Sequence, residues 1–291
     1  MAWLQLSVKT GQANAEALAA FLEELGAVTV SLSDAGDEPV LEPKPGEMPL
    51  WANVTAHALF NEGTEQASLR DVVAATYPDC ADTIVFAELE DREWLNEWKR
   101  DTSPKQYGQR LWVCPWEEQP EDDNSVAVYL EPGLAFGTGD HPTTAMCLRW
   151  LDANPPAGGK VLDYGCGSGL LAIAAVKLGA NRADCVDIDP QALIATNQNA
   201  LQNGIADKIC SFEPAKLADT GFEIVLANIL SGILVDLSST LTGLMSPGGQ
   251  LVLTGILAEQ AQTVIDAYAG SVKLSVAAEE DGWVMLAGRN R

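Results

Sequence analysis

Apolar and polar residues alternate along the first part of the chain in two different periods. A period of two predicts strands, and a period near 3.6 predicts amphipathic helices. On this basis, strands are expected near 3–9, 28–32, 53–60 and 83–89, and helices near 15–25 and 66–77. The resulting βαββαβ order is typical of a small α+β ferredoxin-like domain, which we expect to span 1–88.

From residue 160 to the C-terminus, short apolar runs alternate with helical patterns. This alternation predicts a doubly wound, Rossmann-like α/β domain with a mainly parallel sheet and ligands at the carboxyl ends of its strands. We expect this domain to span 106–291. The charged segment 89–105 carries Trp94 and Trp98 on one helical face, which indicates a linker helix or, equally, the last helix of the first domain.

Between this linker and residue 160, two apolar runs and a glycine-rich loop are found. The runs 111–114 and 126–130 are typical of a β-hairpin with an acidic, proline-containing loop between them. The glycine-rich loop surrounds Phe136 and Thr138 and indicates a constrained backbone instead of a strand.

A helix is expected directly after the glycine-rich loop. Asp140 is its expected N-cap, with Pro142 in the first turn. His141 invites a general-base role, although a histidine beside a helix start is more often a structural hydrogen-bonding group. Thr143 and Thr144 then lie in the first turn, where their hydroxyls can reach a ligand.

The most informative stretch reads Val161-Leu162-Asp163-Tyr164-Gly165-Cys166-Gly167-Ser168-Gly169-Leu170-Leu171. It predicts a strand, a tight turn and a helix N-terminus in direct succession. Alternate glycines permit positive φ and leave no Cβ in the way of a ligand. Asp187 follows the next apolar run and is placed to accept hydrogen bonds from ribose hydroxyls.

The spacing of these glycines separates two kinds of nucleotide site. A dinucleotide fingerprint needs G-x-G-x-x-G, but here the third glycine comes one position early and Leu170 occupies the reserved position. The observed D-x-G-x-G-x-G favours S-adenosylmethionine, which has no pyrophosphate, over NAD. The remaining interpretation is a glycine-rich turn that binds no ligand. The presence of Asp187 after the next strand makes this interpretation weaker.

One further polar residue is expected at the same edge of the sheet. The apolar run 223–227 delivers Asn228 to its carboxyl end. The side-chain oxygen of Asn228 and nearby carbonyls are suited to accept hydrogen bonds from an incoming amine and to orient its lone pair.

Composition narrows the classes of partner. The 291 residues include 41 acidic and 17 basic side chains, a net charge of −24, which repels nucleic acid and attracts a lysine-rich protein. The chain has no apolar stretch long enough to cross a membrane and no basic leader, so we expect a cytoplasmic protein. Six scattered cysteines without C-x-x-C and two histidines indicate reduced thiols and no metal site.

Four motifs at these spacings carry a resemblance to a known family: Gly137–Thr144, Asp163–Gly169, Asp187-Ile188-Asp189-Pro190 and Ala227-Asn228-Ile229-Leu230. Together they closely resemble the bacterial ribosomal protein L11 methyltransferases, over the whole chain. The loop motif is far more specific than the glycine turn, which all class I methyltransferases share. Two positions depart from the family pattern, because Asp140 stands where an uncharged residue is expected and Glu131 where Asp is usual.

The resemblance implies a monomeric, S-adenosylmethionine-dependent lysine N-methyltransferase. Its small domain would recognise ribosomal protein L11, and its large domain would methylate lysine side chains and an N-terminal amine, up to trimethylation. The family's cofactor contacts correspond here to Thr144, Gly165, Asp187 and Asn228, and Phe136, Thr138, Asp163 and Gly167 lie near them in the motifs. Asn228 is the expected catalytic group, through orientation of the amine.

Other enzyme classes with a similar fold differ from this sequence in their motifs or charge. Methyltransferases that act on glutamine or adenine amides carry Asn-Pro-Pro-aromatic after the fourth strand, and this chain has Asn228-Ile229-Leu230. An RNA methyltransferase would present a basic face. A class I methyltransferase for another protein or a small-molecule amine, a module that only binds the cofactor, and an NAD-dependent enzyme remain alternatives.

Overall fold

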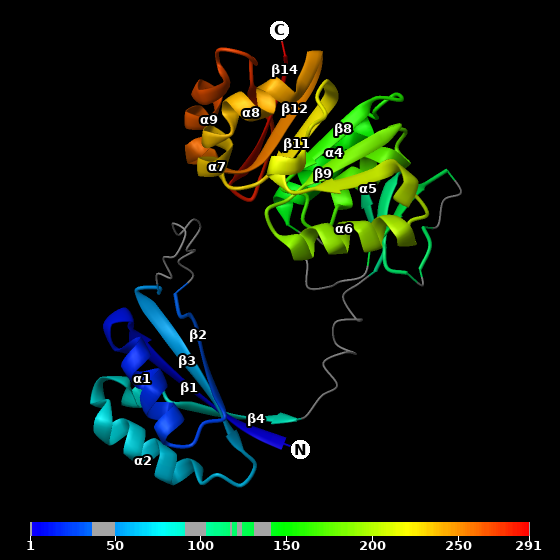
Figure 1. Ribbon diagram of the computed structural model, residues 1–291. Helices are drawn as coiled ribbons and strands as arrows, with labels where there is room; N and C mark the ends of the chain where they lie inside the picture. The colour runs from blue at the N-terminus through cyan, green and yellow to red at the C-terminus, as the bar shows by residue number, and fades with distance from the viewer. Residues whose placement is uncertain are drawn as a thin grey trace. The chain divides into compact units, whose positions relative to one another are not determined.

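The computed structural model describes residues 2–36, 50–90, 103–116, 118–120, 124–130 and 141–290. The chain divides into two compact units, Met1–Leu95 and Asn96–Arg291 (Figure 1). The expected linker helix, with Trp94 and Trp98, lies mostly outside the described residues.

The first unit is a four-stranded antiparallel sheet with both helices on one face (Figure 1). Its elements are β1 (Ala2–Gly11), α1 (Gln12–Glu24), β2 (Thr29–Asp34), β3 (Asn53–Asn61), α2 (Gln66–Thr76), the 3-10 helix η1 (Pro78–Thr83) and β4 (Val85–Glu90). Alternate residues of β1, such as Leu4 and Leu6, share a buried core with Leu18 and Leu22 of α1. The strand order β2-β3-β1-β4 confirms the ferredoxin-like prediction.

The second unit begins with a small three-stranded sheet of β5 (Lys105–Tyr107), β6 (Leu111–Cys114) and β7 (Val126–Tyr129). The predicted hairpin is wrong, because β6 and β7 pair in parallel, from Leu111 beside Val126 to Cys114 beside Tyr129. The hairpin lies one step earlier, where Gly108, at φ +87°, turns β5 into β6. Since β6 already has an antiparallel neighbour through that turn, β7 joins its other edge after a long connection.

The large sheet carries the order β10-β9-β8-β11-β12-β14-β13, with β14 antiparallel to its neighbours. Its strands are β8 (Lys160–Tyr164), β9 (Arg182–Val186), β10 (Ile209–Phe212), β11 (Phe222–Asn228), β12 (Met245–Leu257), β13 (Ser275–Glu280) and β14 (Trp283–Arg289). The helices are α4 (Pro142–Ala153), α5 (Leu170–Lys177), α6 (Pro190–Gln202), α7 (Ser231–Asp236), α8 (Ser238–Leu244) and α9 (Ala261–Tyr268). This is the doubly wound α/β domain that the sequence predicted.

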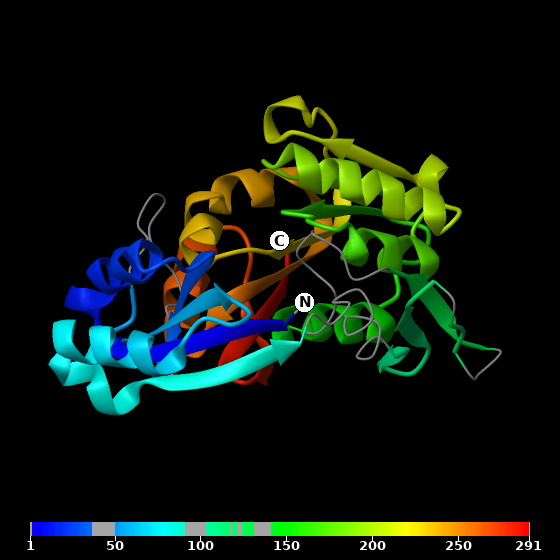
Figure 2. The same ribbon diagram turned by 90° about the horizontal axis from the view of Figure 1, so that it is seen from below.

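Two separate cores lie on the two faces of this sheet. Val161 packs with the residues of α4 and α5, whereas its neighbour Leu162 packs with α7, α8 and α9. Ile224 and Val225 of β11 divide between the cores in the same way. Strands covered on both faces read as continuous apolar runs, and Figure 2 shows the sheet between its helices from a second direction.

Candidate active site

Three neighbouring strands of the large sheet end in polar residues. The strands β9, β8 and β11 are adjacent and parallel, so their carboxyl ends meet at one edge. Asp187 follows β9, Asp163 is the penultimate residue of β8, and Asn228 ends β11. Because adjacent strands are about 4.8 Å apart, the fold places these three predicted site residues at neighbouring positions.

The turn after β8 has the backbone conformation that its glycines predict. Gly165, Gly167 and Gly169 have φ values of +80°, +53° and +77°. A Cβ at Gly165 would overlap the Cγ2 atom of Ile229, and a Cβ at Gly169 would lie 2.7 Å from Cγ2 of Thr196. At these two positions the missing side chain leaves room for protein neighbours, whereas the sequence argument reserved that room for a ligand. A cofactor contact of Gly165 or Gly167 stays a prediction.

Asp187 is held by backbone N–H groups on both sides. Its Oδ2 accepts a hydrogen bond from Gly167 N at 2.9 Å, and its Oδ1 accepts one from Asp189 N at 2.9 Å. Each carboxylate oxygen can accept a second hydrogen bond. Asp187 therefore keeps acceptor capacity for the two hydroxyls of a ribose, the role predicted for it.

Asp163 is almost completely buried at the centre of this edge. Its Oδ2 accepts a hydrogen bond from Ala172 N at 3.1 Å, while its Oδ1 has no hydrogen-bond partner among the described residues. Burial raises the pKa of Asp163 to about 7; the Ala172 N–H opposes this shift, and the charge of Asp187 adds to it. A buried carboxylate with one unpartnered oxygen favours a donor or a cation beside it.

The first turn of α4 brings Thr144 to Asn228. The Nδ2 atom of Asn228 donates a hydrogen bond to Oγ1 of Thr144 at 3.1 Å, and Thr144 is buried. Since the amide nitrogen is engaged, the amide oxygen is the atom of Asn228 that can accept a hydrogen bond from an amine. The structure thus brings together two residues that the sequence assigned separately to one site.

The N-cap of α4 is His141, not Asp140 as the sequence predicted. Pro142 occupies the first helical position, and His141 Nδ1 accepts hydrogen bonds from Thr143 through the backbone N at 3.4 Å and the hydroxyl at 2.7 Å. Proline favours the N1 position because it has no N–H, which fixes the cap at the residue before it. The ring of His141 also packs edge-on against Trp283, with centroids 5.1 Å apart, so its observed contacts are structural.

The remaining predicted residues of the glycine-rich loop, Phe136 and Thr138, lie outside the described residues. The same holds for Asp140 and for Glu131, the two departures from the family pattern. Their roles stay predictions.

Two residues of α6 hold the glycine turn and were not predicted from the sequence. Thr196 Oγ1 donates to the carbonyl oxygen of Gly167 at 3.0 Å, and Asn199 Nδ2 donates to that of Ser168 at 2.8 Å. Polar residues within a helix are usually exposed to solvent, but Thr196 is fully buried. Their spacing of three residues, which places both on one helical face, was the available signal.

An exposed apolar residue also lies beside the site. Ile188, between Asp187 and Asp189, is 82% exposed. Within the described ranges no cluster of histidine, cysteine or carboxylate side chains is arranged to hold a metal ion, and no helix is long and apolar enough to span a membrane.

The doubly wound sheet, the glycine turn after its central strand and the acidic residue after the next one define a Rossmann-like class I methyltransferase domain. Residues 2–291 match the family model of ribosomal protein L11 methyltransferase (PrmA). The chain therefore belongs to this family.

Individual relatives agree with this assignment. The ribosomal protein L11 methyltransferases of Haemophilus influenzae (strain PittEE) and Pasteurella multocida (strain Pm70) are each 45% identical to the chain, over 99% of both sequences. The crystal structure of ribosomal protein L11 methylase from Lactobacillus delbrueckii subsp. bulgaricus is 32% identical, with a TM-score of 0.60. The matched region covers 65% of this chain and 99% of the Lactobacillus chain. Membership confirms the methyltransferase interpretation over an NAD-dependent enzyme.

The methyl donor of this enzyme class is S-adenosylmethionine, and the residues at the sheet edge fit it. Asp187 offers acceptors for a ribose. Asp163 presents a buried oxygen without a hydrogen-bond partner among the described residues, and such an oxygen is compatible with a positively charged ligand. Backbone N–H groups at a helix N-terminus suit an anionic group such as the ligand's carboxylate, and the glycine turn leads directly into α5.

Proposed function

We propose that the protein transfers methyl groups from S-adenosylmethionine to lysine side chains and to the N-terminal amine of ribosomal protein L11, up to trimethylation. The observation that carries this proposal is the pairing of Asn228 with Thr144 at the carboxyl end of β11, beside the cofactor turn. The names of relatives 45% identical to the chain supply the substrate.

The site residues would bind the donor in an extended arrangement along the edge of the sheet. When bound, S-adenosylmethionine supplies a methyl group activated by a positively charged sulfur. Asp187 would accept hydrogen bonds from the ribose, and Ile188 would cover the adenine. The turn around Gly167 and the buried carboxylate of Asp163 would lie beside the amino-acid part.

Asn228 would orient the attacking amine. A lysine ammonium, with a reference pKa of about 10.4, carries no lone pair and cannot attack a methyl group. The oxygen of Asn228 would accept a hydrogen bond from the neutral amine and direct its lone pair along the line of transfer. The proton lost from the amine passes to water, so the site requires no strong dedicated base.

An apolar rim next to Asn228 suits the aliphatic part of a lysine. Leu230 and Ile233, which follow Asn228 at the start of α7, are 41% and 45% exposed. They lie three residues apart and therefore on one side of this helix. Contact with the methylene groups of the target lysine would cover these side chains and remove water from around the amine.

We assign recognition of the substrate to the ferredoxin-like domain. The net charge of −24 favours encounter with a basic protein and disfavours direct contact with nucleic acid. The charge therefore favours free ribosomal protein L11 over the RNA-bound protein as the substrate. We further propose that the enzyme is a cytoplasmic monomer.

The proposal is tested by incubating purified ribosomal protein L11 with the enzyme and S-adenosylmethionine, followed by intact-mass and fragment mass spectrometry. We expect mass gains in steps of one CH₂ unit on lysine and N-terminal nitrogens, and gains that accumulate about 100-fold more slowly with the Asn228→Ala variant. A protein that binds the cofactor but leaves L11 unmodified would overturn the substrate and keep the enzyme class. Other basic proteins and small amines would then be the acceptors to compare.

A further inference from the structure

One face of α6 carries three polar residues that point into the protein. Thr196, Asn199 and Asn203, the last at the C-cap, are spaced by three and four residues and therefore lie on one side of the helix. Thr196 is completely buried and Asn203 is 7% exposed. Burial of a hydroxyl or an amide is unfavourable unless the group forms hydrogen bonds, so the partners of these residues show what the face does.

Thr196 and Asn199 bind two successive carbonyl groups of the cofactor turn, Gly167 O at 3.0 Å and Ser168 O at 2.8 Å. In a trans peptide the C=O and the following N–H point in opposite directions. A fixed carbonyl at Gly167 therefore directs the N–H of Ser168 away from α6. The two bonds set the orientation of the peptide planes on both sides of Ser168.

The close packing of the turn on α6 supports this assignment. A Cβ at Gly169 would lie 2.7 Å from Cγ2 and 2.9 Å from Oγ1 of Thr196. The glycine at 169 is thus needed for the approach of α6, and the approach brings the Thr196 hydroxyl to Gly167.

The segment that leads into α6 also binds the turn, through the N–H of Gly167. Asp187 accepts a hydrogen bond from Asp189 N, at the N-cap of α6, and one from Gly167 N. The N–H of Gly167 and its C=O are therefore both bound by the segment from Asp187 to Thr196. This segment fixes the spacing between the ribose-binding carboxylate and the turn.

We propose that Thr196 and Asn199 are positioning residues for cofactor binding, which act through the glycine turn without touching the ligand. The inference rests on the use of S-adenosylmethionine by this site. Loss of either bond would let the turn adopt other orientations, so cofactor affinity would fall. One neutral hydrogen bond corresponds to a rise of about three- to tenfold in Kd.

Matched variants separate positioning from simple stabilisation. Thr196→Val and Asn199→Asp keep the size of the side chain but remove the donor, while Thr196→Ser keeps the hydroxyl and is the rescue. Asn203 is the control for stability, because it bonds the backbone of Tyr129 in both directions and not the turn. Asn197, exposed on the same helix, is the control for substitution on α6.

The measurements are Kd for S-adenosylmethionine by titration calorimetry, the Tm without ligand, and kcat with ribosomal protein L11 at saturating cofactor. We expect Thr196→Val and Asn199→Asp to raise Kd with kcat within about twofold of wild type, and Thr196→Ser to restore Kd. Asn203→Ala should lower Tm and leave Kd unchanged, and Asn197→Ala should change neither.

Wild-type Kd in Thr196→Val and Asn199→Asp would overturn the inference. A Kd that follows Tm across all variants, Asn203→Ala included, would overturn it as well and leave α6 a purely stabilising element. If the wild-type protein itself failed to bind S-adenosylmethionine, the cofactor assignment would be wrong, and this inference would fall with it.

Discussion

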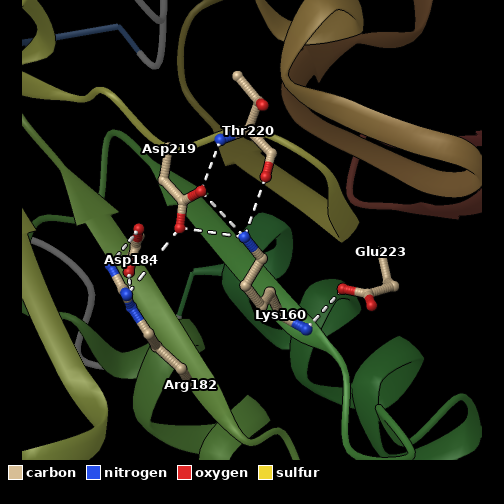
Figure 3. A network of polar contacts seen from close by, with 6 residues as sticks. All are labelled: Lys160, Arg182, Asp184, Asp219, Thr220 and Glu223. Carbon is tan, nitrogen blue, oxygen red and sulfur yellow. Dashed lines mark hydrogen bonds and ion pairs between the residues drawn. The ribbon is translucent and has the colours of Figure 1, made fainter.

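The strands β8 and β9 begin in a network of oppositely charged side chains and end beside two carboxylates that form no ion pair with any described residue. At the amino edge, Lys160 Nζ binds both oxygens of Asp219 at 3.0 Å, and Arg182 binds Asp184 at 2.6 and 2.9 Å (Figure 3). The backbone N of Lys160 also donates to Glu223 at 2.6 Å. Asp219 and Asp184 are thus each paired with a basic side chain, and Glu223 accepts from a backbone N–H.

At the carboxyl edge, Asp163 and Asp187 accept hydrogen bonds only from backbone N–H groups in the part of the chain that the structure describes. No lysine or arginine of the described residues forms an ion pair with either. The pKa values follow this contrast. The hydrogen bond from Lys160 lowers the pKa of Asp219, whereas burial raises that of Asp163 to about 7.

In one sheet, two acidic side chains at the amino edge are thus neutralised by lysine and arginine, whereas those at the carboxyl edge are left for a ligand. Asp184 shows that burial alone is not the distinction. It has no exposed surface, and burial raises its pKa, but Arg182 donates to both of its oxygens. Asp163 has a buried oxygen without such a partner, and this is the feature that favours a cationic ligand.

The largest effect is expected for Asn228→Ala at the carboxyl edge. Loss of the amide oxygen removes the group that orients the amine, so kcat should fall about 100-fold, with a much smaller change in Kd for S-adenosylmethionine. The measurement is single-turnover methyl transfer to ribosomal protein L11. Thr144→Val, which removes only the partner of the Asn228 amide nitrogen, should give a smaller loss. Full activity of Asn228→Ala with unchanged affinity for L11 would show that this residue is not the orienting group.

The next effect is expected for Asp187→Ala, which sharpens the comparison directly. The variant loses the acceptor of the ribose and also the acceptor of Gly167 N, so Kd for S-adenosylmethionine should rise about 10- to 100-fold. Asp219→Ala is the matched control, a carboxylate removed from the opposite edge of the same sheet. Titration calorimetry of both variants decides the point, and equal affinities would contradict the division between the edges.

Local patterns predicted most of this edge. Periodicity located the strands whose carboxyl ends carry Asp163, Asp187 and Asn228, and the alternate glycines predicted the positive φ values of the turn. These features are encoded within a few residues of one another, so a single sequence contains them. The sequence also assigned both Asn228 and Thr144 to the site, and the structure joins them by a hydrogen bond.

Features set by distant partners were missed. The strand β7, which pairs in parallel with β6, is also held by Asn203, at the C-cap of α6 and 74 residues along the chain, through the backbone of Tyr129. Thr196 reads as an ordinary helical position until the turn 29 residues earlier is seen against it. Gly165 makes room for Ile229, which no local pattern shows. In these cases local propensity allows more than one arrangement of the chain, and contacts between distant residues decide which one forms.

An effect on stability is expected for Asp163→Asn. The pKa of Asp163 is about 7 in the folded state and 3.8 by reference, so between these values the folded protein holds a proton that the unfolded chain has lost. The free energy of unfolding therefore decreases as pH rises from about 4 to about 7 and stays low above that. Asparagine removes this loss, so without cofactor the variant should be more stable than wild type at pH 8, by a few kcal/mol.

Thermal unfolding of both proteins from pH 4 to pH 8 measures the effect of Asp163→Asn. The difference in Tm should grow with pH and level off above about pH 7. A difference that is constant across this range would mean that the carboxyl group is not held protonated by the fold. The variant should also bind S-adenosylmethionine more weakly, because it cannot carry the negative charge that the cationic ligand favours.

The smallest effect, and the opposite in sign, is expected for Asp219→Asn at the amino edge. Because Lys160 lowers the pKa of Asp219 in the folded state, the ion pair stabilises the protein above the unfolded-state pKa, and this contribution is lost as pH falls through the lower folded-state value. The variant should therefore have a slightly lower Tm than wild type at pH 7, and the difference should shrink in acid and at high salt, since the pair is partly exposed. Kd for S-adenosylmethionine should not change. The contrary result would be a Tm of Asp219→Asn that rises above that of wild type as pH rises, as expected for Asp163→Asn. The acids of the two edges would then differ in burial, but not in whether the fold pairs them with a basic side chain.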